Sequence, residues 1–112
     1  MDKREVEIAL KTLDEHKAED IALIDVSASN PFASAVIVAT CLNPRALGAM
    51  EDLLEDAYEA EGIKVVVKEG EPDSGWIILS VSETIIHLLL EGNRRELQIE
   101  DLLKRLEEKA KK

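Results

Sequence analysis

The stretch that decides the fold is residues 76–90, which read WIILSVSETIIHLLL. Residues 76–81 and 84–90 are two apolar segments of strand length, and their β-branched and bulky side chains favour extended backbone. Only Ser82 and Glu83 separate the two segments, which predicts a tight turn. Because parallel strands need a crossover of a dozen or more residues, these two strands must be antiparallel.

Three more strands are predicted before this hairpin. Residues 20–26 form a short apolar segment, and residues 35–40 read AVIVAT without polar alternation. A strand without alternation is typical of one that is buried on both faces of its sheet. Residues 63–68 supply the remaining strand, and a segment rich in turn residues joins it to the hairpin. The chain therefore predicts five strands.

Apolar side chains recur at helical spacing in residues 3–17, 44–60 and 99–110. Asp2 and Asn43 stand where a side-chain oxygen can accept hydrogen bonds from the first-turn amides, and Pro44 suits the first helical position. Gly62 follows the second helix, where a left-handed backbone is cheap for glycine. The element order α-β-β-α-β-β-β-α predicts a single α/β domain over residues 1–112, with a mixed five-stranded sheet flanked by helices.

The chain has 112 residues, a length typical of one domain, and a formal net charge of −10 with a pI near 4.6. A protein that grips phosphates needs a basic face, so the charge argues against DNA or RNA as the direct partner. The apolar runs are far shorter than the ~20 residues of a membrane span. One cysteine cannot form an internal disulfide, and the N-terminus has no signal-peptide core, so a cytoplasmic protein is expected.

The sequence holds no catalytic or metal-binding motif. Cys41 lies between a buried strand and a helix start, where a thiol pKa can be lowered, but nothing brings His16 or His87 to it as a base. The cysteine and histidines lack metal-ligand spacing, and the five glycines form no phosphate-binding loop. We therefore expect no catalytic residue, metal or cofactor, and a small core role for Cys41. Asp25, an acid in an apolar strand, is expected to bind backbone at the strand end.

Trp76 is the only tryptophan and begins an alternating strand, with Ile78 and Ser80 on its face. A lone tryptophan is commonly a core residue. It is also a favoured interface anchor, because it buries a large area with few rotamers to freeze. On the next strand, His87 shares a face with Ile85, and whether these side chains join Trp76 depends on a pairing register that the sequence leaves open.

Seven blocks of residues carry a further signal. They are residues 18–26 (AEDIALIDV), 36–40 (VIVAT), Arg45, 69–70 (EG), 73–79 (DSGWIIL), 83–87 (ETIIH) and 94–97 (RREL). In this order and spacing they resemble the ribosomal silencing factor family, also called the Iojap-like family. The resemblance covers roughly residues 7–106.

The resemblance implies a small α/β domain that is similar in fold to nucleotidyltransferases but lacks their catalysis. It also implies a protein that binds ribosomal protein L-fourteen of the large subunit, sterically blocks small-subunit joining and lowers translation. Family members often form homodimers. On this basis the expected contact residues are the anchor Trp76 and, around it, Thr40, Ile78, Glu83, His87 and Arg94.

The sequence departs from the family pattern in several places. The positions are Ser34-Ala35 for an Asp-aromatic pair, Cys41-Leu42-Asn43 for a Gly-Thr/Asn-Ser stretch, Ser82-Glu83 for Gly-Asp, Leu88-Leu89 for an aromatic, and Leu97-Gln98 for Phe-Tyr. The aromatics missing at Ala35, Leu89 and Gln98 are expected to belong to the contact surface, which indicates a divergent member of the family.

Two other functions stay open. A nucleotidyltransferase-like enzyme with an unfamiliar site would bind nucleotide and Mg²⁺, and binding would raise its thermal stability. A homodimeric scaffold would have no ribosomal partner.

Overall fold

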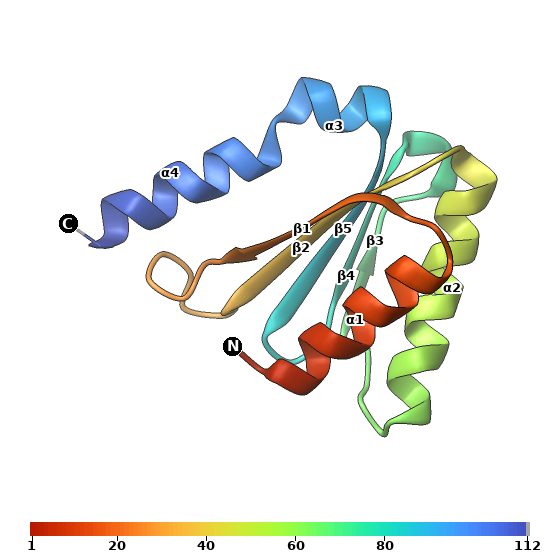
Figure 1. The fold of residues 1–112 in the computed structure, drawn as a ribbon, viewed down its shortest axis with the longest axis horizontal. Helices are drawn as coiled ribbons and strands as arrows, with labels where there is room; N and C mark the ends of the chain where they lie inside the picture. The colour runs from red at the N-terminus through yellow and green to blue at the C-terminus, as the bar shows by residue number, and fades with distance from the viewer. Residues whose placement is uncertain (112) are drawn as a thin grey trace.

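The computed structural model describes residues 1–111, and Figure 1 shows their arrangement. The elements are α1 (Lys3–Glu15), β1 (Glu19–Asp25), β2 (Ala35–Cys41), α2 (Pro44–Ala60), β3 (Val67–Glu69), the short 3₁₀ helix η1 (Pro72–Ser74), β4 (Trp76–Ser80), β5 (Thr84–Leu90), α3 (Glu91–Leu97) and α4 (Ile99–Lys111). No helix within residues 1–111 combines the length and the apolar character needed to cross a membrane.

The five strands form one mixed sheet in the order β1-β2-β5-β4-β3. β5 lies at its centre, parallel to β2 and antiparallel to β4, so the predicted hairpin is confirmed. β1 and β3 pair antiparallel at the two edges. All seven residues of β2 are buried, which confirms the expectation from its unbroken apolar sequence.

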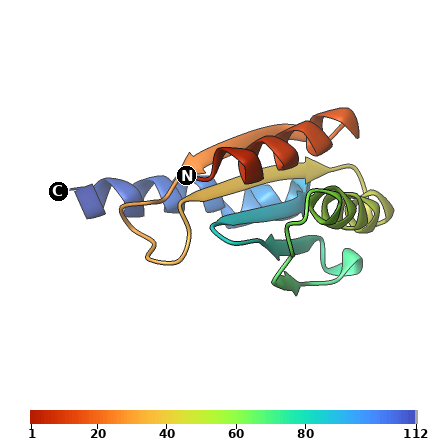
Figure 2. The same cartoon turned by 90° about the horizontal axis from the view of Figure 1, so that it is seen from below.

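One face of the sheet is covered by α1 and α2, which lie in front of it in Figure 2. The main core lies here, and its largest fully buried side chains include Leu13, Ile37, Leu47, Leu54, Tyr58, Ile77, Leu79, Ile86 and Leu88. Fully burying one such side chain contributes about 1.5–3 kcal/mol, so this layer supplies most of the hydrophobic stabilisation. The Tyr58 hydroxyl donates a 2.8 Å hydrogen bond to the Glu5 carbonyl, which joins α2 to α1.

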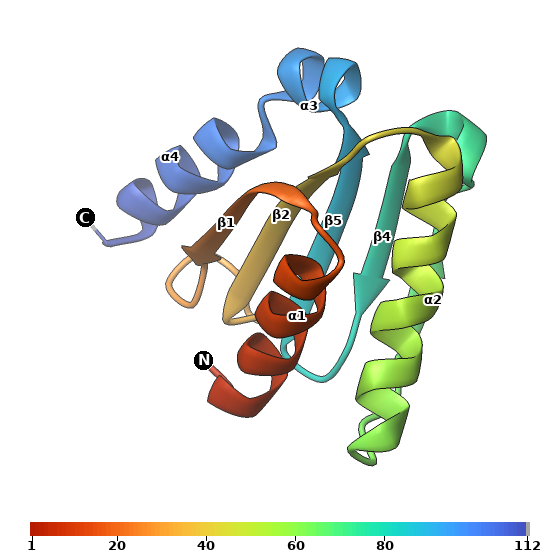
Figure 3. The ribbon, with the colours of Figure 1, turned by 45° about the vertical axis from the view of Figure 1, so that its right-hand side comes forward.

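The opposite face is only partly covered. Ile99 and Leu103 of α4 pack on a smaller cluster that includes Ile24, Val36 and Leu89. Figures 1 and 3 show α4 lying near β1, at one side of the sheet, whereas no helix lies over β4 on that face. Most side chains of β4 and β5 that point this way, including Trp76, Ile78 and His87, are therefore only half-buried, whereas Leu89 is fully buried.

The residues predicted to cap the first two helices, to end the second helix and to bind backbone at the end of the first strand are confirmed. Asp2 accepts a hydrogen bond from the Glu5 amide, and Asn43 accepts one from the Ala46 amide at the start of α2. Gly62 follows α2 with φ 73°. Asp25 accepts from both the amide and the hydroxyl of Ser27, and these bonds lower the pKa of its carboxyl. Short-range chemistry thus sets these boundaries.

Two predictions for the second half of the chain were wrong. The strand predicted over residues 63–68 is β3, which spans only Val67–Glu69. Its partner β4 ends at Ser80, so Ile63 and Val65 have no strand to pair with and pack against the core instead. No helix was predicted between the last strand and residue 99, yet Glu91–Leu97 form helix α3 directly after β5. Contacts to distant residues hold α3 in place despite its Gly92.

Helix α4 is held to the sheet by a buried carboxylate. Within α4, whose residues the structure describes in full, only Glu107 is buried, at 5% exposed. Its oxygens accept hydrogen bonds from the Ala28 amide, the Ser29 amide and the Ser29 hydroxyl, at 2.8–3.1 Å. Glu107 thereby ties α4 to the loop between β1 and β2.

Replacing Glu107 by alanine is expected to lower the free energy of unfolding by about 1–3 kcal/mol, because two partly buried amides lose their acceptor. Urea unfolding followed by circular dichroism would measure it. Glu108→Ala is the matched control, since the neighbouring Glu108 is exposed on the same helix. Equal stability of the two variants would contradict the role given to Glu107.

Candidate functional site

The sheet register brings Trp76, Ile78 and His87 together on the partly uncovered face. Ile78 on β4 pairs with His87 on β5, and Trp76 pairs with Leu89. Across β5, Thr40 of β2 pairs with Leu89 in turn. Because laterally paired residues point to the same side of a sheet, these side chains share one face. The register that the sequence left open thus joins Trp76 to His87, and Thr40 lies in the same row as Trp76.

The turn before β4 fixes the start of the Trp76 strand. Gly75 has φ 79°, a left-handed backbone that favours glycine, and a Cβ added there would meet the Asn93 side chain. The Asn93 amide donates a 3.0 Å hydrogen bond to the Ser74 carbonyl, so α3 is tied to this turn. The turn and α3 together therefore fix the backbone position at which Trp76 begins β4.

Trp76 and His87 form a side-chain pair. The indole Nε1–H donates to His87 Nδ1 at 3.0 Å. Their ring centroids are 5.9 Å apart, and the ring planes are inclined by 29°, a stacked arrangement. The contact sets the orientation of both rings on a face where neither is fully buried.

Burial lowers the pKa of His87 from 6.5 to about 4, because the charged imidazolium loses its hydration. The imidazole is therefore neutral at pH 7. The hydrogen bond and the burial give His87 a structural role, because its ring pairs with Trp76 on the neighbouring strand.

Thr40 and Arg94 meet inside the structure. Arg94 donates from Nη1 to Thr40 Oγ1 at 2.8 Å, and from Nε to Glu100 Oε1 at 2.6 Å. The Arg94 side chain is only 13% exposed, and its hydrogen bond lowers the pKa of the Glu100 carboxyl. These two predicted contact residues thus hold α3 and α4 against the end of β2. No pattern in the sequence pointed to Glu100 as a partner of Arg94.

Glu83 does not join the other predicted contact residues. It lies in the turn before β5, four residues from His87, which corresponds to roughly 13 Å along a strand. Its carboxylate accepts a 2.6 Å hydrogen bond from Ser34, and its amide donates to Glu5 at 3.2 Å. Glu83 therefore lies at the end of the sheet opposite to Trp76.

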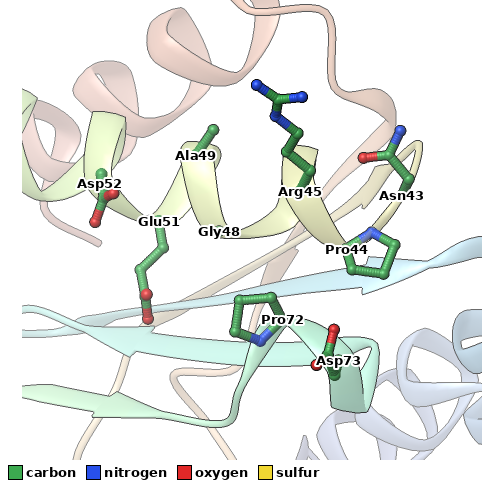
Figure 4. Close-up of a pocket in the computed structure, with 9 residues that line it drawn as sticks. All are labelled: Asn43, Pro44, Arg45, Gly48, Ala49, Glu51, Asp52, Pro72 and Asp73. Atoms are coloured by element: carbon green, nitrogen blue, oxygen red, sulfur yellow. The ribbon is translucent and has the colours of Figure 1, made fainter.

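A surface pocket of about 670 Å³ lies between α2 and η1. Figure 4 shows Arg45 pointing away from Pro72, whereas Glu51 extends from α2 to lie beside Pro72. A Cβ at Gly48 would lie 3.1 Å from Pro72 Cγ, so the two elements touch there. Burial raises the pKa of the Glu51 carboxyl. None of the predicted contact residues lines this pocket, and no group of three or more His, Cys, Asp and Glu within residues 1–111 lies close enough to hold a metal ion.

A family model described as "Ribosomal silencing factor during starvation" matches residues 1–112. The chain belongs to this family. The resemblance carried by the Gly-Trp strand, the hairpin and the strand histidine is therefore confirmed.

Relatives named ribosomal silencing factor share 22–29% of their residues with this chain. The protein from Haemophilus influenzae is 29% identical over 97 residues, which cover 87% of this chain and 95% of the relative. The protein from Chromobacterium violaceum is 25% identical over 95 residues, covering 85% of this chain and 78% of the relative. The protein from Bacillus subtilis is 22% identical over 97 residues, covering 87% and 82%.

Two solved structures share the fold. A crystal structure of a protein from Chromobacterium violaceum superposes with a TM-score of 0.88 at 23% identity, covering 93% of this chain and 87% of that one. A crystal structure of a protein from Bacillus halodurans gives a TM-score of 0.81 at 16% identity, covering 90% and 94%. At these identities the likeness shows the α/β architecture alone.

The positions at which this member of the silencing factor family lacks aromatics do not form one surface. Ala35 and Leu89 are fully buried, Ala35 beneath α1 and α2 and Leu89 in the smaller cluster beneath α4. Gln98 is exposed at the left-handed junction between α3 and α4, with φ 48°. The expectation that all three belong to a contact surface was wrong for Ala35 and Leu89, where smaller or aliphatic side chains fill the core.

Cys41 is a buried strand-end residue, as expected. It lines a pocket of about 310 Å³ that His16 also lines. Burial raises the pKa of the Cys41 thiol to about 11, so the thiol stays protonated at neutral pH. A protonated thiol is a poor nucleophile, and the structure shows no hydrogen bond between these two side chains within residues 1–111.

At pH 8, Cys41 of the folded protein is expected to react with a thiol reagent at least about 100-fold more slowly than Cys41 of the urea-unfolded chain. The thiolate fraction is far lower at a pKa of about 11 than at the ordinary value, and the side chain is buried as well. Stopped-flow absorbance would measure both rates. Comparable rates would show an accessible, activated thiol.

Proposed function

We propose that this chain binds the large ribosomal subunit through ribosomal protein L-fourteen and blocks association with the small subunit, which represses translation. The single observation that carries the proposal is the partly uncovered sheet face on which Trp76, Ile78 and His87 lie together. Membership of the silencing factor family supports a ribosomal partner. Because translation takes place in the cytoplasm, the proposed activity is cytoplasmic.

The chemistry of this face suits a protein partner. Trp76 presents part of its large apolar ring from a strand whose backbone is already ordered, so little conformational entropy is lost when it is covered. Aromatic anchors of this kind dominate the energy of protein interfaces. A net charge of −10 disfavours direct binding to RNA phosphates and suits a basic ribosomal protein.

The size of the domain suits a steric block. Its principal extents are 41 × 34 × 22 Å. A rigid body of these dimensions seated at the subunit-facing surface of the large subunit would occupy space that the small subunit needs. No catalytic step is required for this activity.

Co-sedimentation with isolated large subunits tests the proposal. The wild-type chain should travel with large subunits and not with small subunits, and light scattering should show slower and less complete subunit joining in its presence. A chain that stays at the top of the gradient at low salt would overturn the proposal. A chain that binds large subunits without slowing subunit association would support the ribosomal partner and overturn the proposed steric block.

A homodimer is the second candidate state. Leu102 and Leu106 lie one turn apart on α4 and are 49% and 45% exposed, so a second copy could cover them. Light scattering of the purified chain at micromolar concentration would give its mass. A dimer that fails to bind large subunits would favour the scaffold over the silencing role.

A further inference from the structure

The hydrogen bond between Trp76 and His87 fixes where the histidine carries its proton. An indole N–H can only donate, so His87 Nδ1, 3.0 Å away, must be the acceptor with a free lone pair. A neutral imidazole has one N–H, which is therefore at Nε2. The ring centroids lie 5.9 Å apart, and Nδ1 is the imidazole nitrogen that meets Trp76.

The Nε2–H group is open at the surface. Within residues 1–111, no side chain or backbone group hydrogen-bonds to Nε2, yet no buried side-chain nitrogen or oxygen lacks a partner. The Nε2 atom must therefore reach the solvent. It is a free donor at the edge of an apolar face formed by Trp76, Ile78 and Ile85.

The other polar side chains of this face are already engaged. Thr40 Oγ1 accepts a 2.8 Å hydrogen bond from Arg94, and Ser80 Oγ donates to the Val81 carbonyl at 3.4 Å. Of these three side chains, His87 is the one whose ring N–H no group within residues 1–111 accepts.

We propose that Trp76 acts as a positioning residue that locks His87 as the Nε2–H form, and that the protein docking on this face supplies an uncharged acceptor oxygen to that N–H. The partner chemistry rests on the proposed function. A partner that covered the face without an acceptor would leave a buried donor unpaired, which weakens binding about tenfold or more. A main-chain carbonyl or a side-chain amide oxygen fits better than a carboxylate, because the chain already carries a net charge of −10.

The first test uses the free protein. A ¹⁵N–¹H correlation spectrum of the histidine side chains at pH 7 should show His87 protonated at Nε2 alone. Trp76→Phe keeps an aromatic ring but loses the N–H, and the spectrum of that variant should show a mixture of both neutral forms. A proton on Nδ1 in the wild type, or an unchanged spectrum in Trp76→Phe, would overturn the positioning role.

The second test measures affinity for isolated large subunits. His87→Leu should bind about tenfold more weakly, whereas His87→Gln, whose amide can donate from a similar position, should stay within about threefold of the wild type. Thermal unfolding would confirm that both variants are folded. Wild-type affinity in folded His87→Leu would overturn the proposal that the partner supplies an acceptor oxygen to His87.

The two proposals fail in different ways. If the wild type does not bind large subunits at all, the proposed function and the acceptor both fail, while the spectrum still decides the positioning role. If the wild type binds and folded His87→Leu binds equally well, only the inference about His87 fails.

Discussion

Replacing Trp76 by alanine is expected to weaken binding to isolated large ribosomal subunits by at least about 30-fold, the equivalent of about 2 kcal/mol. The truncation removes the largest apolar side chain from the uncovered sheet face. It also removes the donor that orients His87. The lost ring and the released His87 both lie beside Ile78, in the same part of the sheet face. Anchors at the centre of an interface carry most of its binding energy. Co-sedimentation over a range of chain concentrations would measure the change.

The control for this variant is Leu42→Ala. Leu42 is 83% exposed and lines the pocket between α1 and α2, on the other side of the sheet. Its truncation should change binding by less than about twofold, since residues outside an interface contribute little. Trp76 also packs against the cluster that contains Val36 and Leu89, so circular dichroism must show that Trp76→Ala is folded. A folded Trp76→Ala with wild-type affinity would place the anchor elsewhere.

The sequence predicted those parts of the fold that depend on neighbouring residues. The turn at Ser82 and Glu83 left the strands of residues 76–90 no alternative to antiparallel pairing, and the structure has that hairpin. Asp2 and Asn43 cap their helices through amides three residues away. Such contacts can be read from spacing alone because the partners are fixed by local backbone geometry.

Features that depend on distant residues could not be predicted in this way. Helix α3 contains Gly92 and Asn93, which favour turns, and its place is set by bonds from Arg94 to Thr40 and from Asn93 to Ser74. Glu107 resembles any exposed acid of an amphipathic helix until the loop between β1 and β2 is seen beneath it. In both cases tertiary contacts outweigh the local preference.

The candidate site was predicted in part for the same reason. Alternation placed Ile78 on the face of Trp76, but only the register brought His87 beside them. Glu83 was included because it belongs to the block 83–87 that carries the family resemblance, yet four residues along a strand separate it from His87 and place it at the far end of the sheet. Distance along an extended chain is long, so sequence proximity is a poor guide to a site built across strands.

The Trp76–His87 pair also predicts how stability depends on pH. Burial lowers the pKa of His87 to about 4 in the folded protein, whereas the unfolded chain keeps the ordinary value of 6.5. Between these pH values the unfolded chain binds a proton that the folded protein does not, so the free energy of unfolding falls as the pH is lowered from about 6.5 towards 4. The full effect is about 3 kcal/mol and is present at pH 7, above the unfolded value.

His87→Leu isolates this contribution from those of other groups. Hydrogen bonds lower the pKa of Asp25 and Glu100, which also weakens the fold in acid, and burial raises the pKa of Glu51, which acts in the opposite sense. These groups are common to both proteins and cancel in the difference. Urea unfolding at pH 4, 5, 6 and 7 should show the stability of the wild type relative to His87→Leu falling by about 3 kcal/mol across the range. A constant difference would mean that folded His87 takes up its proton as freely as the unfolded chain does, which would contradict an imidazole buried against Trp76.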